Sequence, residues 1–120
     1  FPVKYAINYG LYGVYDKAEL AHINKYTNII DINADDSMYG IANSVRLGNM
    51  ILCASNISEM KRGDEFYDGE KHKIESLEKI CSDEGMEPII FNLSEYMKSG
   101  AMLSCMVMHL NRVDHFKTLL

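Results

Sequence analysis

Residues 93–111 read LSEYMKSGAMLSCMVMHLN, and the fold is predicted outward from this segment. Ser94 is a good N-cap residue for a short helix. After a small-residue bend at 99–101, nearly every side chain of 102–110 is apolar, which is typical of a strand buried on both faces. The segment therefore places one thiol, Cys105, on a strand just after a bend, where backbone groups can face a ligand.

Cys105 has two interpretations on this pattern alone. Cysteine is among the most buried residue types and often packs as a small hydrophobic side chain. A thiol at a bend can also serve as a nucleophile, because the strand holds it rigidly. The apolar run by itself favours packing.

Before this segment, strands and helices alternate. Helix 70–84 is the clearest, with an apolar stripe that includes Leu77 and Cys81 and a glycine at its end. The order β-α-β, then β-β-α-β, then a last strand favours an α/β fold whose hairpin makes the sheet mixed. The expected elements are strands 3–9, 28–32, 41–47, 50–54 and 87–92, and helices 17–26 and 70–84.

Two segments resemble a known family. The run at 93–111 is similar to the C-terminal motif of the dimethylarginine dimethylaminohydrolases and their arginine deiminase relatives: an LSEF-type start, a bend, and a Thr/Ser-Cys pair opening a final strand that ends in Asn. Upstream, DDSMYGIANS at 35–44, followed by VRL, resembles the DD…AN(C/S) segment of that family. The two segments also stand in the family's order and at a similar separation.

The resemblance implies the pentein fold, an α/β-propeller in which five ββαβ modules form a closed ring around the active site. The chain would then hold about two of the five modules. Residues 1–32 would form a partial module, 41–92 a ββαβ module with a mixed sheet, and 102–111 the ring-closing strand that carries Cys105.

The same resemblance implies a chemistry. The Cys105 thiolate would attack the central guanidinium carbon of arginine or a methylated arginine, forming a covalent intermediate that water hydrolyses to citrulline. The backbone of Ser99 and Gly100 would face the amino-acid end of this small guanidino substrate. Several relatives carry an acidic residue where Gly100 stands, so side-chain contacts there do not carry over. No metal or cofactor is implied.

The family's catalytic histidine would lie upstream of this chain. The chain therefore resembles the C-terminal portion of a larger protein, whose missing N-terminal portion would be its partner, and alone we expect it to be inactive. Unpaired sheet edges would favour homo-oligomers. His109 lies four residues after Cys105, which along a strand is roughly 13 Å and too far to activate the thiol.

Two other functions stay open. The chain could be a non-catalytic, pentein-like binding or regulatory module that kept the fold and lost the site. It could also belong to an amidinotransferase, which shares the cysteine chemistry. Asp35 and Asp36 could hold a guanidinium group, although turn or cap chemistry is the favoured interpretation.

Composition excludes several classes of function. The net charge is −5 and the basic residues are scattered, so no nucleic-acid-binding face is expected. The longest apolar run is too short to span a membrane. The three cysteines are odd in number and lack zinc-type spacing, which favours free thiols in the reducing cytoplasm, with Cys53 and Cys81 as core residues.

Overall fold

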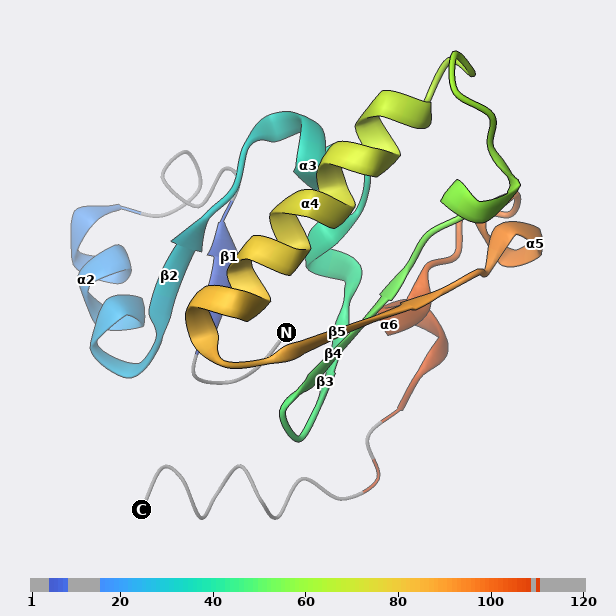
Figure 1. Cartoon of the computed structure of the whole chain (residues 1–120). Helices are drawn as coiled ribbons and strands as arrows, with labels where there is room; N and C mark the ends of the chain where they lie inside the picture. Colours follow the sequence, from blue (N-terminus) through green and yellow to red (C-terminus); the bar gives the residue numbers. More distant parts are fainter. Residues whose placement is uncertain (1–4, 9–15, 109, 111–120) are drawn as a thin grey trace.

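A computed structural model describes residues 5–8, 16–108 and 110 (Figure 1). The elements are β1 (Tyr5–Asn8), α2 (Lys17–Tyr26), β2 (Asn28–Asp31), α3 (Ala34–Met38), η1 (Ile41–Asn43), β3 (Val45–Leu47), β4 (Met50–Ala54), η2 (Ile57–Glu59), α4 (Tyr67–Glu84), β5 (Glu87–Phe91), α5 (Ser94–Met97) and α6 (Leu103–Met106).

The first part of the chain forms a β-α-β unit. Strands β1 and β2 pair in parallel, with Tyr5 opposite Asn28, and α2 connects them. The side chain of Asp16 caps α2 by accepting hydrogen bonds from the N–H groups of Ala18 and Glu19, and Glu19 binds back to the N–H of Asp16. This capping box satisfies backbone donors that the first turn leaves free. The expected helix at 17–26 is therefore confirmed.

The second part forms a three-stranded mixed sheet in the order β3-β4-β5. Strand β3 is antiparallel to β4 across a tight turn, where Gly48 has a φ of +62°. Strand β5 is parallel to β4, and α4 makes the crossover between them. Figure 1 shows α4 lying across this sheet, with α5 and α6 on the side away from α2. The α/β class and the mixed sheet are confirmed.

The core lies between α4 and one face of this sheet. Ile51 and Cys53 of β4 pack with Leu77 and Cys81 of α4 and with Ile41 of η1. The periodicity of α4 thus predicted its buried stripe, and both cysteines are core residues as expected. Burial raises the pKa of the Cys81 thiol to about 11 and also raises that of Cys53, so neither is an available nucleophile.

A buried ion pair joins α4 to the sheet. Lys73 is 1% exposed, and its ammonium lies 2.8 Å from Oε2 of Glu70. It also donates to the carbonyl oxygens of Tyr39 at 3.1 Å and of Ala54 at 3.0 Å. The hydroxyl of Ser55 donates to Glu70 at 2.6 Å. Lys73 lies off the apolar stripe of α4, a position that by pattern alone is typical of a solvated side chain, and the structure buries it.

Three other expectations need correction. The strand expected over 102–111 is not formed, because Leu103–Met106 is the short helix α6 and the residues after it up to 108 lie outside any strand. The polar loop expected at 33–37 contains α3, capped by the side chain of Asn33. The strand expected from residue 41 begins at Val45, because η1 comes first. A strand forms only where its backbone pairs with a neighbouring strand. In these segments the backbone instead makes the local hydrogen bonds of short helices.

Removal of the Lys73 ammonium should strongly destabilise the fold. In Lys73→Met the Glu70 carboxylate stays buried without its counter-ion, so we expect a loss of about 3–5 kcal/mol in the free energy of unfolding. Urea denaturation followed by circular dichroism measures it. As a matched control, Lys79→Met removes a surface ammonium paired with Asp83 and should cost about 0.5 kcal/mol or less. Equal stability of Lys73→Met and the wild type would contradict this account.

Candidate active site

Cys105 is the accessible thiol of the three. It lies on α6 and is exposed, whereas Cys53 and Cys81 are buried. The N-cap residue Met102 is extended and starts α6 by accepting a hydrogen bond from the N–H of Cys105. The prediction that the thiol follows a bend is therefore confirmed, but it stands on an exposed helical turn and not within a buried strand.

The two resembling segments meet at this thiol. Asn43 of η1, which belongs to the upstream segment, lies against Cys105, with its Nδ2 and Oδ1 atoms each 3.7 Å from the sulfur. The hydroxyl of Ser104 donates a hydrogen bond to Oδ1 of the same amide. Asn43 and Cys105 are 62 positions apart in sequence, so the chain brings together two segments that only the resemblance had associated.

Close packing at Gly40 fixes this meeting point. Gly40 has a φ of +80°, and a Cβ atom built there would overlap the sulfur of Met102. Only glycine allows both the left-handed backbone and the close approach of the Met102 side chain. The segment before η1 is thereby held against the segment before α6.

Ser99 and Gly100 lie in the turn after α5, and both are exposed. The N–H of Ser99 donates to the carbonyl of Tyr96 at 3.0 Å, and the N–H of Gly100 donates to that of Met97 at 2.9 Å. Because both N–H groups are used inside the turn, the carbonyl oxygens are the backbone groups left for a ligand. The expected bend is present, and its contact with substrate stays a prediction.

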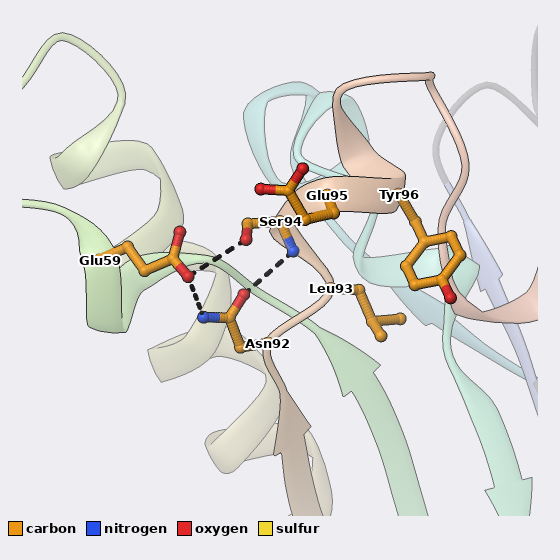
Figure 2. Close-up of a pocket in the computed structure, with 6 residues that line it drawn as sticks. All are labelled: Glu59, Asn92, Leu93, Ser94, Glu95 and Tyr96. Atoms are coloured by element: carbon orange, nitrogen blue, oxygen red, sulfur yellow. Dashed lines mark hydrogen bonds between the residues drawn. The ribbon is translucent and has the colours of Figure 1, made fainter.

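A pocket of about 260 Å³ lies beside α5 (Figure 2). It lies beyond the ends of the parallel strands β4 and β5, the edge of an α/β sheet where ligands commonly bind. Figure 2 shows Glu59 of η2 reaching toward Asn92 and Ser94. Its Oε1 atom accepts hydrogen bonds from Asn92 at 2.7 Å and from Ser94 at 3.1 Å. Leu93, Glu95 and Tyr96 complete the lining.

The structure around this pocket differs from the sequence prediction in the N-cap of α5, and the pocket includes residues that the sequence analysis did not name. The N-cap position of α5 is Leu93 and not Ser94, whose hydroxyl binds Glu59 instead. Glu59 and Asn92 were not singled out from the sequence. Parallel pairing of strands 50–54 and 87–91 places the residues that follow each strand at the same edge of the sheet. This pairing is the sequence feature from which the pocket could have been predicted.

Asp36 is tied to α4. It is 3% exposed, and its carboxylate binds Nδ1 of His72 at 2.7 Å and the hydroxyl of Ser76 at 2.7 Å. Its position in the first turn of α3, with Asn33 capping its N–H, agrees with the cap interpretation of the Asp35–Asp36 pair. Because two groups already occupy the Asp36 carboxylate, it is a tether between helices rather than an open guanidinium ligand.

A second pocket, of about 450 Å³, lies between α3 and α4 and includes this tether. Its lining consists of Asn33, Asp35, Asp36, Tyr39, Asp68, Gly69 and His72.

Among residues 5–8, 16–108 and 110, no group of three or more His, Cys, Asp or Glu side chains is arranged to hold a metal ion. In the same part of the chain, no helix has the length and apolar character needed to cross a membrane. His109 and His115 lie outside the described residues.

Comparison with known proteins gives no match, whether to a family model, to a curated protein or to a solved structure. The likeness to the dimethylarginine dimethylaminohydrolases therefore rests on the motif residues alone, and what it implies is taken up as a proposal.

The His72–Asp36 pair should make stability depend on pH. The hydrogen bond and charge of Asp36 raise the pKa of His72 above its usual value near 6.5. A raised pKa means that the pair stabilises the fold fully below the unfolded-state pKa and that this contribution is lost as pH rises through the folded-state pKa. The stability difference between wild type and His72→Gln, measured by urea denaturation, should therefore shrink from about pH 5.5 to about pH 8.5.

His22→Gln is the matched control for this measurement. His22 is exposed on α2, and its ring contacts the ring of Tyr26. Its stability difference from the wild type is the baseline for exchanging an exposed histidine, against which the change for His72→Gln is compared. A flat difference for His72→Gln would show that protonation of His72 does not contribute to stability through Asp36.

Proposed function

We propose that this chain is the nucleophile-bearing, C-terminal part of a guanidino-group hydrolase that converts arginine or a methylated arginine to citrulline. The observation that carries the proposal is the contact of Cys105 with Asn43. An accessible thiol stands where the two family-like segments meet, and the other two thiols are buried. A pentein-like arrangement of the elements, with about two of five modules in this chain, belongs to the same proposal.

The proposed reaction has two steps. The Cys105 thiolate forms a bond to the guanidinium carbon, and the C–N bond to ammonia or a methylamine breaks as a general acid protonates the leaving nitrogen. Water then adds to the S-alkylthiouronium carbon, and the C–S bond breaks to give citrulline and to restore the thiolate. The acid–base group and the carboxylates that orient the cation come from the N-terminal portion, which makes this chain inactive alone.

One feature of the chain supports a substrate with a cationic, N–H-rich end. The carbonyl oxygens at Ser99 and Gly100 accept hydrogen bonds and cannot donate them. A guanidino amino acid offers many N–H donors and fits such acceptors. In the nearby pocket, the Glu59 carboxylate binds Asn92 and Ser94 and that of Glu95 binds Lys98, so neither is counted as a ligand.

The apolar sheet face opposite α4 supports a partner. In the register of the sheet, Ile51 and Cys53 face α4, so their neighbours along the strands point the other way. This opposite face carries Leu47, Met50, Leu52, Ile89 and Phe91. Leu47 is 57% exposed and Phe91 is 43% exposed. We propose that the missing N-terminal portion covers this face, and that copies of the chain associate through it when that portion is absent.

Charged residues on this face should weaken self-association. We expect the chain to form dimers or larger species in sedimentation velocity experiments. The double variant Leu47→Glu with Phe91→Glu should raise the dissociation constant at least about tenfold, because burying unpaired carboxylates is unfavourable. Met38→Glu places the same charge on an exposed apolar residue of α3 and should leave association unchanged. A wild-type chain that stays monomeric at high concentration would exclude this interface.

Amidine labelling tests the chemistry of Cys105. Exposure alone predicts that any alkylating agent reacts faster with Cys105 than with Cys53 or Cys81, so the informative quantity is the preference for a cationic reagent. We compare the rates at which 2-chloroacetamidine and uncharged chloroacetamide alkylate Cys105, each divided by its rate with N-acetylcysteine. We expect the normalised rate of the amidine to be at least about tenfold higher. A factor of this size is the effect of one charge-assisted hydrogen bond to the amidinium. Peptide mass spectrometry assigns the labelled residue.

Cys105→Ser and Cys81→Ser are the control variants. The first should abolish amidine labelling, and the second should leave it unchanged. N-methylarginine should protect Cys105 from the amidine. If the normalised preference is absent and methylarginine gives no protection, the hydrolase proposal fails and a non-catalytic module remains.

A further inference from the structure

The side-chain amide of Asn43 faces the sulfur of Cys105 with both of its polar atoms. Nδ2 and Oδ1 each lie 3.7 Å from Sγ, within reach of the weak hydrogen bonds that sulfur makes. An amide oxygen accepts a hydrogen bond from a thiol, and an amide N–H donates one to a thiolate. Asn43 can therefore bind both protonation states of Cys105, with a different atom for each.

Ser104 selects the atom that serves the thiolate. Its hydroxyl donates to Oδ1 of Asn43. An amide oxygen has two lone pairs, so Oδ1 can accept from Ser104 and from a Cys105 thiol together. A thiolate has no proton to give, so Nδ2 is the amide atom that can bind it. For the thiolate, each polar atom has a complementary partner when Oδ1 accepts from Ser104 and Nδ2 donates to the sulfur.

The backbone around Asn43 is fixed by the fold. Ile41 at the start of η1 is fully buried, and the hydroxyl of Ser44 donates to its carbonyl at 2.7 Å. The N–H of Asn43 donates to the carbonyl of Gly40 at 2.9 Å. A side chain on so constrained a backbone can hold a neighbouring group in place with little reorganisation. Asn43 thus brings a rigid contact to a thiol that itself stands on an exposed, one-turn helix.

We infer that Asn43 is the positioning residue of Cys105: its amide N–H holds and stabilises the thiolate, and Ser104 fixes the orientation of that amide. The inference deepens the proposed function and rests on it, since it assigns the group that prepares the nucleophile for attack on the guanidinium carbon. It requires no group from outside this chain. The thiolate and its supporting amide are both present in the described residues.

Alkylation by iodoacetamide tests this assignment, because the thiolate displaces iodide and the rate follows the thiolate population. Asn43→Ala should lower the rate at Cys105 about tenfold at neutral pH, because the thiolate loses the amide N–H that holds it. Asn43→Asp keeps the size of the side chain but sets a carboxylate against the sulfur, so its rate should fall below that of Asn43→Ala. Ser104→Ala should lower the rate by a smaller factor, since the amide loses its fixed orientation.

The uncharged, near-isosteric variant Asn43→Leu separates a direct role from a merely structural one. If Asn43 only filled space, Asn43→Leu would react as the wild type does and only Asn43→Ala would differ, whereas a direct role lowers the rate in both variants. Asn24→Ala is the matched control, because Asn24 is an exposed asparagine of α2, outside the candidate site. It should leave alkylation of Cys105 unchanged. Urea denaturation of each variant checks that the fold is intact.

The two reagents distinguish failure of this inference from failure of the proposed function. Wild-type rates in both Asn43→Ala and Asn43→Leu, or a wild-type rate in Asn43→Leu alone, would overturn the inference even if the amidine preference holds. Iodoacetamide is uncharged and has no guanidino group. A clear Asn43 effect without any amidine preference would therefore keep the positioning role and reject the hydrolase.

Discussion

The fold depends on one buried ammonium group. Lys73 has three N–H donors and directs them to Glu70, to the carbonyl that ends β4 at Ala54, and to the carbonyl of Tyr39 after α3. A buried charge without partners costs several kcal/mol, so all three acceptors must be in place together. The interaction therefore joins helix α4, the end of the central strand and the end of α3 into one cooperative unit. Hydrophobic packing of Leu77 on the sheet supplies burial but does not select these partners.

This constraint extends to the candidate site. Tyr39 is followed by Gly40 and η1, so the lysine that holds the Tyr39 carbonyl also limits where Asn43 can lie. The neighbouring His72 holds the same segment through Asp36. Two consecutive residues of α4 thus tether the chain shortly before the amide that contacts Cys105. The thiol stands on a short, exposed element, and its position is fixed from the side of η1.

The sequence predicted the elements that local pattern determines. Helix α4 follows from the apolar spacing that ends at Cys81 and from the left-handed glycine after it, and the β3–β4 hairpin follows from its glycine turn. Lys73 was missed because a pattern of side chains along one helix does not show the acceptors that converge from β4 and α3. The apolar run around Cys105 was taken for a strand, since short buried strands and short apolar helices share the same composition. In the described part of the chain, the sheet consists of β3, β4 and β5, and the run around Cys105 is not one of its strands.

The candidate site could be predicted only in part for a similar reason. Cys105 was found through a motif, but its contact with Asn43 joins residues far apart in sequence, and no periodicity contains such a contact. The resemblance gave the order and the separation of the two segments, and it did not predict that they meet or through which atoms.

The residues directly after Cys105 add a physical requirement. Met106, Val107 and Met108 are apolar and exposed, so the thiol stands at the edge of an uncovered apolar surface. In water, the attraction between a thiolate and a cationic carbon is screened, and exclusion of water strengthens it several-fold. A surface that closes over these three residues would therefore bury apolar area and exclude water from Cys105, and under the proposed function it would couple association with a partner to the reactivity of the thiol.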